Sequence, residues 1–109
     1  MKPALFHRAA LDTIQTFPEA VRKELGKAIF DPQKGELLGM PVSRPMPSVG
    51  PGIEELRIRD RGGSYRAFYF SRCERGILVF HAFIKKTRGT SKQDIATGKT
   101  RLKELRDES

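Results

Sequence analysis

The sequence is poor in the residues that supply covalent or metal-based stability. Cys73 is the only cysteine among 109 residues, which excludes an intramolecular disulfide and a cysteine-based zinc site. Apolar runs are too short to span a membrane, and the start Met1–Ala4 has no apolar signal-peptide segment. These absences predict a single cytoplasmic domain, residues 1–109, that folds on its own hydrophobic core without metal or cofactor.

Acidic residues are also fewer than basic ones, and the difference is confined to one part of the sequence. The chain holds 21 Lys plus Arg against 13 Asp plus Glu, a formal net charge of +8. Residues 57–92 carry ten basic side chains and only two acidic ones, Asp60 and Glu74, so this stretch holds the whole excess of eight. A basic excess confined to one third of the chain predicts an anionic partner at one surface. A solvated, solubilising surface is the alternative interpretation.

Hydrophobic periodicity predicts an α+β fold in the order β-α-α-β-β-β-α. The expected strands cover residues 2–6, 53–60, 64–73 and 77–84. The expected helices cover residues 8–15, 16–35 and 91–106. Short turns make the last three strands an antiparallel meander, and the run 77–84 is apolar on both faces, which is typical of a central strand. We expect two N-terminal helices and a C-terminal helix packed on a mainly antiparallel four-stranded sheet.

Local signals refine the ends of these elements. Thr16 with Glu19, and Ser91 with Asp94, have the spacing of helix-capping boxes. Gly98 falls inside the last helix, where it costs roughly 1 kcal/mol relative to Ala. Residues 39–52 contain four prolines and three glycines, which predicts a loop and neither a helix nor a central strand.

Strand alternation places Arg57 and Arg59 on one face, about 6–7 Å apart along the strand. This distance suits successive phosphates of a nucleic acid. Arg66 lies on the next strand, and the cations Lys85, Lys86 and Arg88 follow the last strand. Because no helix carries this basic group, single-stranded RNA fits better than the major groove of DNA.

Three rings of the same region, Tyr65, Tyr69 and His81, are candidates for stacking on a base. A core position is the preferred interpretation of Tyr69. The other interpretation of His81 is a core histidine whose ring nitrogens are hydrogen-bonded, since it lies in an apolar strand.

Three segments resemble the RelE/ParE toxin superfamily, and among its members the HigB-like, phage-derived branch. They are Glu55-Leu56-Arg57, Gly63-Ser64-Tyr65-Arg66 and the run from Leu78 to Thr87. The resemblance extends over nearly the whole chain. It implies a RelE-like fold and the toxin of a type II toxin–antitoxin pair, an endoribonuclease that cleaves mRNA on the ribosome and so inhibits translation. The implied cleavage proceeds by attack of the 2′-OH and uses no metal.

The resemblance also implies site residues. The implied active-surface residues are Arg57, Arg59, Arg66, and Lys85 or Lys86. We therefore expect Arg66, Lys85, Lys86 and Arg57 to be catalytic, and from the charge and stacking patterns we expect Arg59, Arg61, Tyr65, His81 and Arg88 to bind RNA. Arg66 would stabilise transition-state charge, and Lys85 or Lys86 would transfer a proton or bind phosphate, because Arg is a poor base. No Tyr follows Tyr69, so the C-terminal stacking tyrosine of some relatives is missing here.

The resemblance implies two kinds of partner. One is mRNA on the ribosome, with contacts to ribosomal RNA, and the other is a cognate helix-turn-helix antitoxin. Two alternatives share the fold and the basic surface. One is a ParE-like, non-enzymatic poison of DNA gyrase, and the other is a catalytically silent RNA-binding relative.

Overall fold

The computed structural model describes residues 1–86 and 88–107, and within these residues five strands form one sheet of order β1-β5-β4-β3-β2. The strands are β1 (Ala4–Phe6), β2 (Ser43–Pro45), β3 (Ile53–Asp60), β4 (Gly63–Cys73) and β5 (Gly76–Lys85). The helices are α1 (Arg8–Ile14), α2 (Glu19–Gln33) and α3 (Lys92–Asp107). β1 pairs with β5 in parallel, and the other pairs are antiparallel, so the expected α+β architecture is confirmed.

The sheet has one strand more than the sequence predicted. β2 lies inside the proline-rich stretch and pairs antiparallel with β3, with Arg44 opposite Glu55. As a short edge strand it needs hydrogen bonds on one side only, which is why Pro45 is tolerated at its end. The rest of this stretch also packs, because Met46 and Val49 are buried in the core. The prediction of a loop over 39–52 was therefore wrong for Ser43–Pro45, whereas its exclusion of a helix and of a central strand was confirmed.

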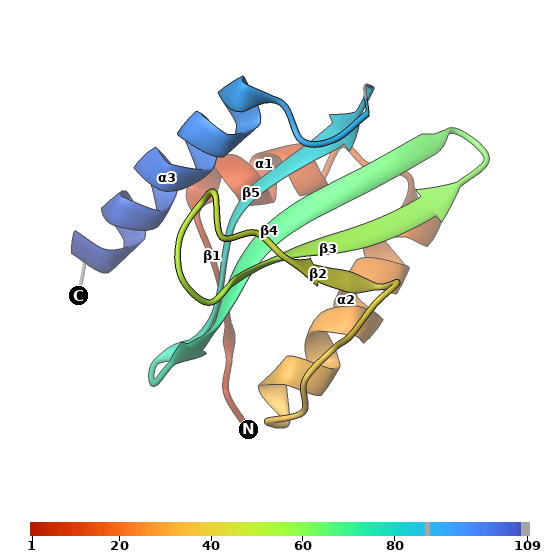
Figure 1. Cartoon of the computed structure of the whole chain (residues 1–109). Coiled ribbons are helices and arrows are strands. Elements are labelled where there is room, and N and C mark those ends of the chain that lie inside the picture. The colour runs from red at the N-terminus through yellow and green to blue at the C-terminus, as the bar shows by residue number, and fades with distance from the viewer. Residues whose placement is uncertain (87, 108–109) are drawn as a thin grey trace.

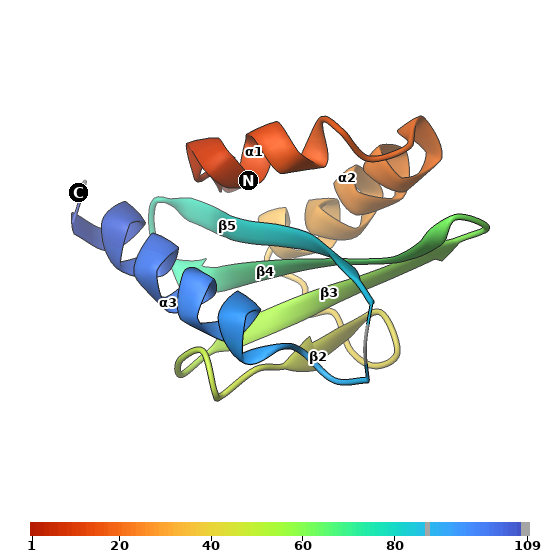
Figure 2. The same cartoon turned by 90° about the horizontal axis from the view of Figure 1, so that it is seen from above.

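The helices lie on both faces of the sheet (Figures 1 and 2). α1 and α2 cover one face, and α3 crosses the other face beside β5. Side chains of β4 alternate between two cores, with Tyr69 in the core under α1 and α2 and Phe68 in the core under α3. β5 lies between β1 and β4 and is buried on both faces, as its apolar run predicted. None of the helices in the described residues has the length and apolar character needed to cross a bilayer.

Gly98 lets α3 approach the sheet closely. A Cβ added to Gly98 would lie 2.8 Å from Cδ2 and 2.9 Å from Cε2 of Phe68. Both residues are buried, so the ring of Phe68 has little space into which to move. The glycine that weakens the helix by itself is thus the residue that permits its packing.

Substitution of Gly98 by Ala should destabilise the protein although it improves helix propensity. Overpacking costs about 1–3 kcal/mol and the propensity gain is about 1 kcal/mol, so we expect a net loss of up to about 2 kcal/mol. Gly26 is the matched control, since it lies in α2 with nothing within 4 Å of an added Cβ. Denaturant unfolding should show Gly26→Ala to be stabilised by up to about 1 kcal/mol. Equal gains in both variants would contradict this account of α3 packing.

Candidate functional site

Five basic side chains from four strands gather at one end of the sheet. We call Arg44, Arg57, Arg59, Arg66 and Lys85 the cationic cluster. Arg57 lies directly opposite Arg66, and Lys85 lies opposite Ser64, two residues from Arg66 on the same face. Directly opposite residues share a face of a sheet. Because Phe83 lies opposite Arg66 and belongs to the core under α3, the cluster occupies that same face.

A buried carboxylate lies inside the cationic cluster. The Glu55 side chain is 0% exposed, and its Oε1 accepts a hydrogen bond of 3.2 Å from Arg44 Nε. Its Oε2 accepts a bond of 2.6 Å from Thr90 Oγ1, and Arg66 Nε lies 3.9 Å from Oε1 as an ion pair. Arg44 Nη2 also donates to Thr90 Oγ1, at 3.3 Å. Glu55 therefore neutralises part of the charge that the strands bring together.

Sequence reasoning assigned no role to Glu55, Arg44 or Thr90. The alternation that puts Arg57 and Arg59 on one face puts Glu55 there as well, so this signal was present in the sequence. Arg44 carried no such signal, because it lies in the stretch that was predicted to be a loop.

Arg66 is the most buried member of the cluster and is 2% exposed. Burial lowers its pKa, and the charges of Arg57, Arg44 and Arg59 lower it further, whereas Glu55 raises it. The Nε atoms of Arg57 and Arg66 are buried and have no hydrogen-bond partner among the described residues. Both residues line a cavity of about 400 Å³, together with Arg59, Pro41 and Val42. Three guanidinium groups thus line one cavity, a lining that suits an anion.

A bulge in β5 decides which of the two consecutive lysines joins the cluster. Phe68 pairs with His81 but Tyr69 pairs with Val79, so Phe80 is an extra residue in β5. Leu78 faces α3, and an unbroken strand would then place even-numbered residues, and so Lys86, on that face. The bulge moves Phe83 and Lys85 there instead.

Lys85 has the electrostatic surroundings of a site residue. Partial burial lowers its pKa, and Arg66, Arg44 and Arg57 lower it further, whereas Glu55 raises it. The other expected cations are placed differently: Lys86 follows the end of β5, Arg61 lies at the turn between β3 and β4, and Arg88 lies two residues before Thr90. These three side chains are exposed.

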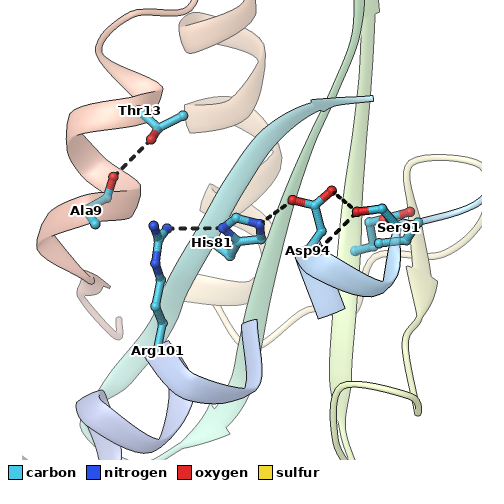
Figure 3. A network of polar contacts seen from close by, with 8 residues as sticks. Ala9, Thr13, His81, Ser91, Asp94 and Arg101 are labelled. Atoms are coloured by element: carbon cyan, nitrogen blue, oxygen red, sulfur yellow. Dashed lines mark hydrogen bonds and ion pairs between the residues drawn. The ribbon is translucent and has the colours of Figure 1, made fainter. Parts of the chain in front are cut away.

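The two expected stacking rings do not reach the cluster. Tyr65 is buried on the opposite face, where its ring centroid lies 4.9 Å from that of Phe17. His81 is buried under α3 (Figure 3), where Asp94 Oδ1 lies 2.8 Å from Nε2 and Arg101 Nη1 lies 3.1 Å from Nδ1. Arg has no acceptor, so Nδ1 accepts and Nε2–H donates to Asp94. His81 is thus a core histidine whose two ring nitrogens are both hydrogen-bonded, and these bonds connect α3 to the sheet.

A bound metal ion needs several ligating side chains close together. In the part of the chain that the structure describes, no three His, Cys, Asp or Glu side chains gather as ligands of one ion. The donors of the cationic cluster are cations, which suit the oxygens of an anion.

Comparison with known proteins gives one family. The sequence profile of the family described as "Phage derived protein Gp49-like (DUF891)" matches residues 12–103. No curated protein matches the sequence. A solved structure of the E. coli toxin RelE, a double arginine-to-alanine mutant in the free state, is similar at 19% identity and a TM-score of 0.49. That alignment covers 94% of this chain and 95% of the other.

The neutral His81 predicts a loss of stability in weak acid. Burial lowers its pKa below the ordinary 6.5, and Arg101 lowers it further, whereas the hydrogen bond to Asp94 raises it. The unfolded chain therefore binds a proton before the folded one does, as pH falls below about 6.5. We expect the free energy of unfolding of the wild type to fall by up to about 1.4 kcal/mol per pH unit in that window. Denaturant unfolding of His81→Gln should lack this component, and identical pH profiles would contradict the assignment.

Removal of the Glu55 charge should destabilise the protein strongly. Glu55→Gln leaves Arg66 buried without its countercharge, and breaking a buried pair in this way costs about 3 kcal/mol. Glu54→Gln is the matched control, because Glu54 is partly exposed and points to the opposite face of the same strand. In urea unfolding, Glu54→Gln should lower the free energy of unfolding by less than about 1 kcal/mol. Similar losses in the two variants would show that Glu55 is not the countercharge of the cluster.

Proposed function

The chain belongs to the phage-derived Gp49-like family, and from its cationic cluster we propose that it is the toxin of a type II toxin–antitoxin pair that cleaves mRNA on the ribosome. Membership of this family confirms the phage-derived branch to which the sequence pointed. The toxin activity and the cleavage of RNA are our inference from the site.

One observation carries the proposal: Arg57, Arg59 and Arg66 line a single cavity, and two of them have unsatisfied buried Nε donors. Guanidinium groups bind phosphate oxygens through paired donors. The burial of Arg66 strengthens its attraction to an anion, because little water competes for a buried charge. A phosphodiester group of RNA is an anion that suits such a cavity.

The proposed reaction is attack of the RNA 2′-OH on the adjacent phosphorus. The bond from phosphorus to the 5′ oxygen breaks, which leaves a cyclic phosphate and a 5′-OH. One proton leaves the 2′ oxygen and one proton reaches the departing 5′ oxygen. Negative charge grows on the phosphoryl oxygens meanwhile, and preorganised donors aimed at that charge lower the barrier. We assign this stabilisation to Arg66, and phosphate positioning to Arg57 and Arg59.

Lys85 is the residue we assign to proton transfer. Partial burial and the neighbouring arginines lower its pKa, so more of it is neutral at a given pH than of an ordinary lysine. Its position opposite Ser64, on the same face as Arg66, supports this role over Lys86. Lys86, Arg61 and Arg88 are exposed near the site and suit contacts to ribosomal RNA.

A toxin of this kind requires a neutralising partner. We propose a small helix-turn-helix antitoxin that covers the cationic cluster, and a cytoplasmic place of action, where ribosomes translate.

Induced expression in a susceptible bacterium tests the function. Mapping of RNA ends should show cuts within translated regions, and growth should stop. Arg57→Ala and Lys85→Ala should each lower the cutting rate about 100-fold or more, the usual cost of losing a positioning group or a general acid–base group. Arg66 is less suitable for this test, because its burial makes misfolding of the variant a competing cause.

The control is Arg22→Ala, which removes the same charge from an exposed position on α2. It should cut as the wild type does. Loss of cutting in this variant as well would mean that net charge matters and the cluster does not. Inhibition of gyrase supercoiling without any RNA cuts would favour a gyrase poison, and harmless expression without an antitoxin would favour a silent RNA-binding protein.

A further inference from the structure

We propose that Pro41 and Val42 form the apolar wall of a base-binding pocket, an inference that rests on the proposed function and names the ligand of the same site. The cavity of about 400 Å³ takes one nucleotide of single-stranded RNA. The phosphate lies against Arg57 and Arg66, and the base lies against the wall. This gives the proline-rich stretch a role in substrate binding.

The wall is attached directly to the cationic cluster. The carbonyl oxygen of Val42 accepts a hydrogen bond of 2.8 Å from the backbone N–H of Arg57. The N–H groups of Val42 and Ser43 both donate to the carbonyl oxygen of Gly39, each at 3.1 Å, which closes a tight turn. The position of the apolar wall is therefore set by the same strand that presents the arginines.

A buried hydrogen-bond chain holds the wall from below. Ser43 is buried, and its Oγ donates to Glu54 Oε1 at 3.2 Å. Because that proton is used, the hydroxyl of Tyr69 donates to Ser43 Oγ, at 2.6 Å. A pocket whose wall is fixed before binding loses little conformational entropy when its ligand arrives.

The lining of the cavity combines charged and apolar residues, and this combination favours a nucleotide over a free phosphate. Three arginines contribute charge to the lining, whereas the apolar contribution comes from Pro41, which is exposed, and Val42, which is 40% exposed. A free phosphate satisfies only the arginines and leaves Val42 in water. A nucleotide carries both a phosphate and a flat base whose faces are poorly hydrated, so it suits both kinds of residue. The volume lies within the range of about 300–1,000 Å³ for small-ligand pockets.

Binding to the purified protein at low ionic strength tests the wall. The probes are a fluorescent oligouridylate and an abasic ribose-phosphate oligomer of the same length and charge, followed by anisotropy. The wild type should bind oligouridylate more tightly than the abasic oligomer. Val42→Ala should reduce that preference about three- to tenfold, the effect of removing two partly buried methyl groups. Its affinity for the abasic oligomer should stay within about twofold of the wild type, because the arginines are unchanged.

Two further variants separate the wall from general effects. Leu37→Ala is the matched control, since Leu37 precedes the same turn, is 85% exposed and does not line this cavity. It should keep the full preference for bases. Val42→Ile keeps the apolar surface and should keep the preference too. Equal loss in Val42→Ile and Val42→Ala would overturn the proposal in favour of a folding defect.

The binding results show separately whether the base wall or the proposed RNA cleavage fails. Equal binding of the two oligomers by the wild type, with both weakened by Arg57→Ala, would overturn the base wall and leave RNA cleavage standing. Failure of the wild type to bind either oligomer at low salt would overturn both. Tighter binding of an oligoglutamate than of oligouridylate would assign the cavity to an acidic protein segment and overturn the nucleotide.

Discussion

The buried carboxylate of Glu55 is the interaction on which the cationic end of the sheet depends. Arg57 and Arg66 lie directly opposite each other, an arrangement that is unfavourable for like charges. Glu55 bonds Arg44 and pairs with Arg66, so one negative charge allows the guanidinium groups to be held close together. It does not satisfy all their donors, since the Nε atoms of Arg57 and Arg66 have no partner among the described residues. The uncompensated positive charge of the cluster suits an anion as its ligand.

The same carboxylate joins the site to the packing of α3. Thr90 bonds Glu55, and only four residues later Asp94 begins the chain of bonds through His81 to Arg101. The close approach of Gly98 to Phe68 then fixes the helix further along. Residues 90–98 are therefore held by the site at one end and by the core at the other. Loss of the Thr90 contact should weaken the packing of α3, and the reverse, because both contacts lie on one short stretch of chain.

Local sequence signals succeeded where short-range chemistry alone decides the structure. Ser91 caps the start of α3 as predicted, since Asp94 N–H donates to Ser91 Oγ. The equivalent prediction for Thr16 was wrong, because Thr16 continues the last turn of α1 and its hydroxyl donates to the carbonyl of Thr13. The sequence did not predict β2, because a three-residue edge strand is too short to show periodicity. Its pairing depends on β3, which lies several residues further along the chain.

The sequence by itself determined which residues share a face of each strand, because alternation is a property of the extended backbone. Arg57 and Arg59 were brought together by that rule, and the local basic excess of residues 57–92 predicted an anionic partner. Only the tertiary structure decided between Lys85 and Lys86, since the bulge at Phe80 reverses the faces of the strand. It also decided that Tyr65 and His81 pack inside. Registers, bulges and the face that each helix covers arise from long-range packing, and no local pattern encodes them.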